Sequence, residues 1–352
     1  MNRRYDWQRL QQYVAGLFNA AGLSRANAEI VAESLVQADL RGVDSHGVVR
    51  TDIYLKRMQA GMMNPDGDVA VERSSGSVTL LDGRNNPGAV IGSKALELAL
   101  QGAKRQGSAV VGVKGSNHFG TCAYYLLKAI EQDTIMIILS NASQTMPPTG
   151  GIRPFIGTNP FSVGVPAGKC RPFVLDMATS VVARGKIIVA AERGEDIPRG
   201  WAIDKHGNPT TNAREALDGS VLPMAGAKGY GISMFIDILS GVLTGAGFGR
   251  YVNNMYENWD EPQNVGHLFV AVDINAFMPV AYFKERMDRY IREIKAEPKA
   301  PAVEEILIPG ELELRCTEAR MASGIELPAS VEKQLETWGE RFGRKLSDAL
   351  RG

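Results

Sequence analysis

The chain of 352 residues has few cysteines, no excess of charge of either sign and no long apolar run. Its three cysteines lie far apart without CxxC spacing, so no disulfide scaffold is expected and the thiols are predicted to be reduced. Lys and Arg number 39, as do Asp and Glu, so the positive excess typical of nucleic-acid binding is missing. The N-terminus shows no apolar signal segment, and no apolar run is long enough to cross a bilayer. We therefore expect a cytoplasmic protein with no nucleic-acid or membrane partner.

Several common catalytic motifs are also missing. The chain contains no Walker A, HExxH or GxSxG sequence, which removes the usual signals of nucleotide hydrolysis, zinc proteolysis and α/β-hydrolase chemistry. It also lacks the GxGxxG fingerprint of Rossmann dinucleotide-binding domains. The nearest match, GAGFG at 245–249, is followed by Arg250 where a glycine is needed, and it follows a predicted helix instead of a strand. We interpret this segment as a loop.

Hydrophobic periodicity predicts helices at the start of the chain and an α/β arrangement in its middle. Apolar residues at helical spacing indicate helices over 10–21, 24–36 and 54–61. Short runs rich in β-branched and aromatic residues then predict strands, with helices between the first of them. The predicted strands are 77–81, 109–113, 135–139, 161–165, 173–175 and 268–272, and the predicted helices are 89–106, 123–132 and 229–243.

The C-terminal part is predicted to be helical again. Prolines punctuate a linker at 298–309, and Ser330 is placed to cap a helix with apolar residues up to Leu346. Neither terminal segment alone offers enough apolar surface for a core, so we expect the two to pack together. The predicted organisation is a helical domain of residues 1–72 with 305–352 and an α/β domain of residues 73–304.

Two of the four histidines lie in polar, glycine-rich surroundings, in SHG (45–47) and SNHFG (116–120). A histidine side chain titrates near neutrality and can transfer a proton during carbonyl chemistry. For either residue alone, a structural hydrogen-bonding role is equally open. His206 is interpreted as part of a turn and His267 as a structural residue at the start of a strand.

Arg50 lies four residues beyond His46, so a helical turn would place both side chains on one face. Its guanidinium could then hold a carboxylate through two parallel hydrogen bonds and orient a 2-oxo acid. The alternative is a surface arginine or a structural ion pair with Asp39 or Asp44.

Small and hydroxyl residues follow two predicted strands, in GTNP (157–160) and DMATS (176–180). Ligands commonly bind at such positions in α/β sheets, although ordinary turn chemistry explains each segment separately. Lys228 and Gly229 precede the long helix, where a lysine can meet a cofactor phosphate. An exposed lysine without a ligand is the alternative.

Together these segments resemble the type 2 malate/L-lactate dehydrogenase family, which includes ureidoglycolate, sulfolactate and diketogulonate enzymes and is unrelated to the Rossmann lactate dehydrogenases. The resemblance runs nearly from end to end. The segments that carry it are RGVDSHGVVR (41–50), SNHFG (116–120), GTNPF (157–161), DMATSVVARGK (176–186), PRGWAIDKHGNPTT (198–211), AKGYG (227–231), DILSGVLTGAGFG (237–249) and PGELE (309–313).

The resemblance implies an α/β fold with a non-Rossmann, mixed-sheet nicotinamide-binding domain and a helical domain formed by both termini. It also implies a homodimer with active sites near the subunit interface, and it makes the missing GxGxxG fingerprint expected. The implied cofactor is NAD, with NADP as the alternative. One departure concerns 140–145, which reads SNASQT where the family is often rich in Thr-Asn and proline.

The resemblance also implies roles for individual residues. His118 and His46 are the catalytic candidates, and Ser45 and Arg50 are the substrate contacts. The implied cofactor contacts are Phe119, Gly120, Asp176, Met177, Ala178, Thr179, Ser180, Lys228, Gly229, Gly310, Glu311, Leu312 and Glu313.

The expected activity is hydride transfer between the nicotinamide C4 and the C2 of a small 2-hydroxy or 2-oxo acid such as malate, lactate or ureidoglycolate. His118 is favoured as the acid–base group and His46 as an orienting residue, and no metal is expected. One alternative is a reductase of cyclic 2-imino acids on the same scaffold. Another is a cofactor-binding protein that has lost catalysis, which the presence of both histidines and Arg50 argues against.

Overall fold

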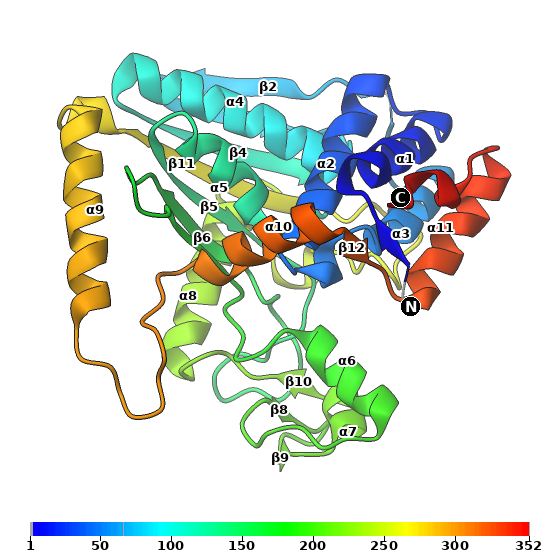
Figure 1. The fold of residues 1–352 in the computed structure, drawn as a ribbon. Coiled ribbons are helices and arrows are strands. Elements are labelled where there is room, and N and C mark those ends of the chain that lie inside the picture. The colour runs from blue at the N-terminus through cyan, green and yellow to red at the C-terminus, as the bar shows by residue number, and fades with distance from the viewer. Residues whose placement is uncertain (1–2, 66, 352) are drawn as a thin grey trace.

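The computed structural model describes residues 3–65 and 67–351, which form a seven-stranded sheet with its helices, a group of helices from both ends of the chain, and a small lobe. In Figure 1 the helices of the two termini lie together on the right, and the lobe lies below the sheet. This architecture is the mixed-sheet α/β class that the sequence predicts.

The large sheet has the strand order β2-β3-β4-β11-β5-β6-β7. β3 and β4 are parallel, and every other neighbouring pair is antiparallel. All the predicted strands lie in it, whereas β2 was not predicted because its residues are almost all exposed and show no apolar alternation. The strands are β2 (Ala70–Ser75), β3 (Val78–Asp82), β4 (Ser108–Ser116), β5 (Thr134–Ser140), β6 (Phe161–Val165), β7 (Phe173–Met177) and β11 (Val265–Asp273).

Helices cover both faces of the sheet because its central strands are apolar on both sides. In β11, Phe269 and Ala271 pack in a cluster with α4 (Gly88–Gln106) and α5 (Cys122–Ile130). Leu268 points to the opposite face and packs with Ile236. That face is covered by α8 (Ala227–Asp237), which continues as a π-helix, Ile238–Val242. The alternation along one strand thus builds two cores.

Helices from the two ends of the chain share a third core. Its members include Leu10, Leu35, Leu335 and Trp338, each at most 6% exposed. The hydroxyl of Tyr13 donates to the carbonyl of Leu335 at 2.7 Å. The domain boundaries at residues 72 and 305 stay a prediction. The elements of this group are β1 (Arg4–Tyr5), α1 (Trp7–Ala20), α2 (Arg25–Leu40), α3 (Arg50–Gln59), β12 (Ile325–Glu326), α11 (Ala329–Arg341) and a 3-10 helix, Leu346–Ala349.

The C-terminal third differs from the prediction in two ways. Ser330 does not cap a helix, since α11 begins at Ala329, after Pro328, without a side-chain cap. The fixed φ of Pro328, −59°, already suits the start of a helix. Two helices were also missed, α9 (Val280–Ala296) and α10 (Glu311–Ser323). α10 buries only Glu311 and shows almost no amphipathic pattern, whereas the apolar residues of α9 do recur at helical spacing and were overlooked.

The small lobe was not predicted as a separate unit. It contains two short helices and a three-stranded sheet around Ile187 and Ala216. His206 lies exposed in a turn of this lobe, as predicted. No helix in the described ranges is long and apolar enough to cross a membrane. The lobe consists of α6 (Arg184–Arg193), β8 (Ala202–Ile203), β9 (Pro209–Thr210), α7 (Ala213–Asp218) and β10 (Ser220–Val221).

Candidate active site

Two histidines from separate parts of the chain lie side by side. His46 ends a short 3-10 helix, Asp44–His46, between α2 and α3, and His118 follows the end of β4. Their ring centroids are 5.3 Å apart, and both side chains are half-buried. The structure therefore brings the two catalytic candidates together where the terminal helices meet the sheet.

The loop that carries His118 is held from three directions. The buried Asn117 donates from Nδ2 to the carbonyl of Asn86 at 2.9 Å. The backbone N–H of His118 donates to Oε1 of Gln263 at 3.0 Å. α4 begins against this loop at Gly88, where a Cβ would lie 2.5 Å from the carbonyl oxygen of His118. Only glycine leaves room for that approach, so the sequence fixes the backbone of His118 through its neighbours.

Phe119 and His267 support this loop from the sheet. Their rings stack with centroids 4.0 Å apart. The fully buried His267 has Nδ1 2.8 Å from Oγ of Ser140 and Nε2 2.8 Å from Oγ of Ser116. Both ring nitrogens thus have partners inside the sheet, in agreement with the structural role predicted for His267.

Tyr54 contacts the imidazole of His118 directly, a role that was not predicted from the sequence. Its hydroxyl oxygen lies 2.5 Å from Nδ1 of His118 and 3.4 Å from the carbonyl oxygen of the same residue. The hydroxyl can therefore accept from a protonated Nδ1 while it donates to the carbonyl, or donate to an unprotonated Nδ1. The signal was present in the sequence, because Tyr54 follows Arg50 by four residues and so shares its helix face.

Arg50 points toward the histidines from the first turn of α3. Its Nε donates to the carbonyl of Ser45 at 2.7 Å, and its Nη1 donates to the hydroxyl of Tyr256. Oγ of Ser45 lies 2.9 Å from Nδ1 of His46. Ser45 therefore links His46 and Arg50, although the predicted continuous helical turn is absent, because Gly47 is extended between the 3-10 helix and α3.

The alternative interpretation of Arg50, an ion pair with Asp39 or Asp44, is not realised among the described residues. Asp44 pairs with Arg320 of α10 at 2.5 Å. The buried Asp39 accepts a hydrogen bond from the backbone N–H of Val48 at 2.9 Å. Both acids therefore serve the loop around His46 and leave Arg50 without a carboxylate partner.

Burial keeps both histidines neutral. Desolvation lowers the pKa of His46 to about 4, and the charge of Arg50 adds to this effect. Desolvation, followed by the charge of Arg50, also lowers the pKa of His118 well below its usual value. A neutral imidazole can accept a proton, so the site at pH 7 contains a base next to a cation that can bind a carboxylate.

The segment 176–180 lies beside the loop of His118. Asp176 accepts from the backbone N–H of Ala123 at 2.8 Å and from Oγ of Ser162 at 2.7 Å. Burial raises the pKa of Asp176. The buried Thr179 and Ser180 bond to backbone carbonyls, as the turn interpretation requires, while Met177 and Ala178 are half-buried. Asp176 thus ties β7 to the start of α5, directly after Phe119 and Gly120.

The other two segments predicted to contact the cofactor, 228–229 and 310–313, lie at the starts of α8 and α10. Lys228 is exposed in the first turn of α8, and a Cβ at the buried Gly229 would lie 2.0 Å from the carbonyl oxygen of Met224. Gly310 precedes α10 with a φ of +93°.

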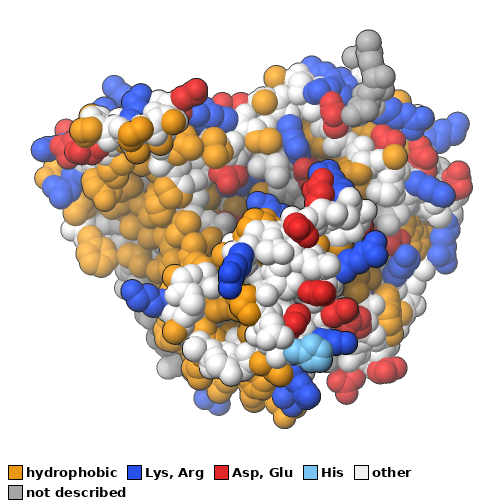
Figure 2. Space-filling model, turned by 90° about the horizontal axis from the view of Figure 1, so that it is seen from below, with side chains coloured by type: hydrophobic (Ala, Val, Ile, Leu, Met, Phe, Trp, Pro, Cys, Tyr) orange, Lys and Arg blue, Asp and Glu red, His pale blue; other side chains and the backbone are white. Residues whose placement is uncertain are grey.

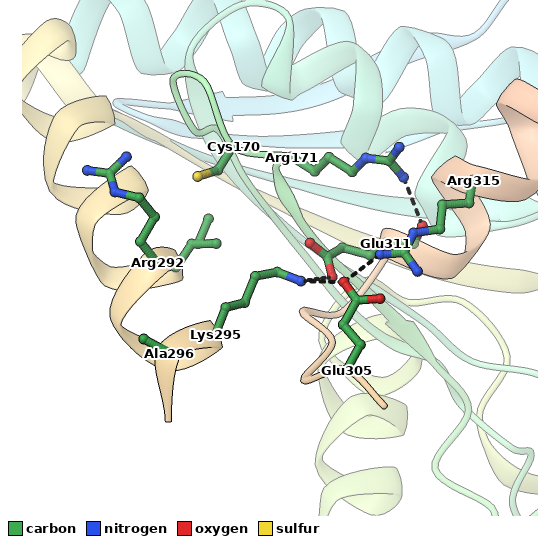
Figure 3. A pocket seen from close by; sticks show the side chains of 9 residues that line it. Cys170, Arg171, Arg292, Lys295, Ala296, Glu305, Glu311 and Arg315 are labelled. Atoms are coloured by element: carbon green, nitrogen blue, oxygen red, sulfur yellow. Dashed lines mark hydrogen bonds and ion pairs between the residues drawn. The ribbon is translucent and has the colours of Figure 1, made fainter. Parts of the chain in front are cut away.

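Figure 3 shows that Glu311 points into a cavity between α9 and α10, where it pairs with Lys295 at 2.7 Å. The same cavity is lined by Arg171, Glu305 and Arg315. Leu312 is largely exposed. The charge of Glu313, on the same segment, acts on the buried Arg41.

Buried polar atoms without a hydrogen-bond partner show whether a cofactor would fit near Asp176 and Glu313. Nε and Nη1 of Arg41, in a residue only 4% exposed, have no hydrogen-bond partner among the described residues, and neither has Oγ1 of Thr121. Burial lowers the pKa of Arg41, while Glu313 and Asp176 oppose that shift. A buried donor without an acceptor is costly, so these atoms fit a ligand rich in oxygen, such as a dinucleotide. Sequence analysis had not singled out Arg41.

The fold and the site define a class: an α/β protein in which two half-buried histidines lie beside an arginine, without a Rossmann fingerprint. A family model described as malate/L-lactate dehydrogenase matches residues 5–336. A malate dehydrogenase from Pyrococcus horikoshii is 40% identical over 348 residues, 97% of this chain and 96% of that protein. The sulfolactate dehydrogenase structure from Methanocaldococcus jannaschii superposes with a TM-score of 0.93 at 36% identity, covering 98% and 99% of the two chains. The chain belongs to the malate/L-lactate dehydrogenase family.

Other relatives show how the family varies. The ureidoglycolate dehydrogenase (NAD(+)) of Escherichia coli K12 is 35% identical, covering 97% of this chain and 94% of that protein. A (2R)-3-sulfolactate dehydrogenase (NADP(+)) from Chromohalobacter salexigens is 32% identical, with coverages of 96% and 98%. The structure of a delta1-piperideine-2-carboxylate reductase from Pseudomonas syringae pvar. tomato has a TM-score of 0.85 at 26% identity, with coverages of 96% and 99%. The expected class, a dehydrogenase with a nicotinamide cofactor, is confirmed; the substrate and the choice of NAD or NADP are finer questions.

The lowered histidine pKa values predict sensitivity to acid. Burial lowers the pKa of His267 to about 3 and that of His46 to about 4. Between pH 6.5 and these values the unfolded chain binds protons that the folded chain does not, so the free energy of unfolding falls as the pH falls. We expect urea denaturation of the variant His267→Gln to depend less steeply on pH between 6.5 and 4 than that of the wild type.

The matched control for this measurement is His206→Gln, which alters an exposed histidine in the small lobe. Its pH dependence should equal that of the wild type. Equal slopes for His267→Gln and the wild type would contradict the neutral, buried state of His267.

Proposed function

We propose that this protein transfers a hydride between NAD(P) and the C2 atom of a small 2-hydroxy or 2-oxo acid, with His118 as the acid–base residue. The observation that carries the proposal is the pairing of His46 and His118, 5.3 Å apart between ring centroids, beside Arg50, which has no carboxylate partner among the residues that the structure describes. A bound nicotinamide supplies the hydride acceptor or donor. The chain supplies orientation and the proton.

Arg50 is the group that binds the substrate carboxylate. Its Nε donates to the carbonyl of Ser45 and its Nη1 to the hydroxyl of the exposed Tyr256, so a planar carboxylate would bind the Nη1 and Nη2 edge in place of that hydroxyl. Ser45 lies next to this edge and to His46, so it is placed to contact the same substrate. This arrangement would hold C2 of a 2-hydroxy acid near the histidines.

His118 takes the hydroxyl proton during oxidation and returns it during reduction. Its lowered pKa keeps the imidazole neutral at pH 7, as a base requires. When Nδ1 of His118 carries the proton, it can donate a hydrogen bond to the Tyr54 hydroxyl. The unprotonated Nε2 is then free to accept the proton of the substrate. His46, whose Nδ1 is engaged by Ser45, is the orienting residue.

The predicted contacts hold the cofactor in this proposal. Phe119 and Gly120 lie beside His118. Asp176 of β7 accepts a hydrogen bond from Ala123 at the start of α5, which fixes its carboxylate. Glu313 and the unpaired Arg41 lie near Asp176 and extend the same region. The proposed cofactor is NAD, with NADP as the alternative. The remaining proposed contacts are Met177, Ala178, Thr179, Ser180, Lys228, Gly229, Gly310, Glu311 and Leu312.

We also infer a homodimer. Phe235, Val242 and Leu243 on α8 and the helix turns after it are 57%, 54% and 65% exposed. Figure 2 shows hydrophobic side chains gathered on its left side, where α8 and α9 lie. A large exposed apolar surface is typical of a subunit interface.

The location and the partners are proposals of the same kind. The three cysteines are free, as expected in a reducing compartment, which supports a cytoplasmic location. The zero net charge supports a small-molecule acid as the partner instead of a nucleic acid.

A second candidate is the reduction of a cyclic 2-imino acid. The similarity to a delta1-piperideine-2-carboxylate reductase structure favours it, and such a substrate also carries a carboxylate for Arg50. A protein that binds the cofactor without catalysis is disfavoured, because both histidines and Arg50 meet in one site.

A spectrophotometric screen tests the proposed reaction. Malate, lactate, ureidoglycolate, sulfolactate and diketogulonate are each assayed with NAD and NADP at the absorbance band of the reduced nicotinamide. We expect turnover with at least one acid and a preference for NAD. Activity with a cyclic imino acid and none with any oxo acid would select the reductase. Silence in every pair despite measurable NADH binding would support the inactive binding protein and reject the proposal.

The two histidines should differ in what their loss removes. His118→Asn is expected to lower kcat by about 10²–10⁴-fold, the usual contribution of a general acid–base group. NADH affinity, measured by fluorescence titration, should change little. His46→Asn is expected to raise KM more than it lowers kcat. If His118→Asn kept the wild-type kcat while His46→Asn lost it, the two roles would be exchanged.

A further inference from the structure

Tyr256 lies on the edge of Arg50 that faces away from Ser45. Nη1 of Arg50 donates to the Tyr256 hydroxyl, and the guanidinium carbon lies 5.7 Å from the centre of the Tyr256 ring. The tyrosine is 54% exposed, so it lies at the solvent side of the site. Tyr256 lies outside all the segments that carry the family resemblance.

The loop that carries Tyr256 is anchored to the helical part of the chain. The fully buried Arg57 of α3 donates to the carbonyls of Met255 at 3.1 Å and Asn258 at 2.8 Å. The guanidinium of Arg57 also lies 5.4 Å from the ring centre of Trp259. The backbone on both sides of Tyr256 is therefore fixed, and the phenol is held over Arg50 by more than its own contact.

The same loop reaches the proton-transfer residue. Oε1 of Gln263 accepts the backbone N–H of His118 at 3.0 Å. One segment of the chain, 256–263, thus contacts both the side chain of Arg50 and the backbone of His118.

The chemistry of the phenol fits the carboxylate that Arg50 would bind. An arginine binds a carboxylate through two parallel N–H donors, and one of these donors now points at the Tyr256 oxygen. When a carboxylate oxygen takes that position, the phenolic O–H becomes available to donate to it. Resting on the proposed function, we propose that Tyr256 is a substrate-binding residue that donates its O–H to the carboxylate held by Arg50.

The variant Tyr256→Phe removes only the hydroxyl and tests this proposal. The probe is oxamate, an isostere of a small 2-oxo acid, titrated against the protein saturated with NADH and followed by NADH fluorescence. We expect the Kd of oxamate to rise about 10-fold or more, the usual effect of losing a hydrogen bond to a charged group. The Kd of NADH and the thermal unfolding midpoint should remain as in the wild type, because the residue is exposed.

The matched control is Tyr251→Phe, since Tyr251 is 66% exposed and its ring contacts Phe248 edge-to-face, with ring centroids 5.2 Å apart. Oxamate binding to this variant should equal that of the wild type. Wild-type oxamate affinity in Tyr256→Phe would overturn the inference and leave the proposed function intact. A parallel loss of NADH and oxamate affinity would show a structural role and would also overturn it. A wild-type protein that binds NADH but neither binds oxamate nor reduces any 2-oxo acid would reject the proposed function itself.

Discussion

The contact between the Tyr54 hydroxyl and Nδ1 of His118 joins the two halves of the molecule. Tyr54 belongs to α3, whose core is shared with the C-terminal helices, and His118 ends a central strand of the sheet. The relative position of His46, Arg50 and His118 depends on this junction. Arg50 begins α3 and His46 lies just before it, whereas His118 follows β4 of the sheet. A site built from two cores is only as well defined as the contacts between them. The loop that contains Asn258 and Gln263 adds two such contacts, one with Arg57 of α3 and one with the backbone of His118.

Burial gives the junction its chemistry. The imidazoles of His46 and His118 lose water when the helices cover the end of the sheet, so their pKa values fall and both stay neutral. Beside them lies a cation, Arg50, which has no carboxylate partner within residues 3–65 and 67–351. A neutral base beside such a guanidinium suits a substrate with a hydroxyl next to a carboxylate. The membership in the malate/L-lactate dehydrogenase family agrees with that chemistry.

Sequence alone predicts the apolar strands and the long helices well, because strands such as β11 are apolar on both faces and leave an unambiguous pattern. It also predicts the histidine pair and Arg50, because these lie in short polar segments. Tyr54 was missed because its spacing fits a buried helix face as well as a site. Gln263 and Tyr256 were missed because they act from a loop distant in the sequence. Helix α10 was missed because few of its residues are buried, and Ser330 was misread because Pro328 starts α11 without a cap.

We propose that a half-buried, neutral His118, oriented by Tyr54, carries the proton. The most direct measurement is the pH dependence of kcat/KM for oxidation of the best hydroxy acid, in the wild type and in Tyr54→Phe. The account predicts a wild-type activity that stays level as the pH falls through 6.5, because the pKa of His118 lies well below that value. It also predicts a lower kcat/KM in Tyr54→Phe with NADH affinity unchanged. A wild-type profile that falls off at pH 6.5, together with an unchanged kcat/KM in Tyr54→Phe, would contradict it.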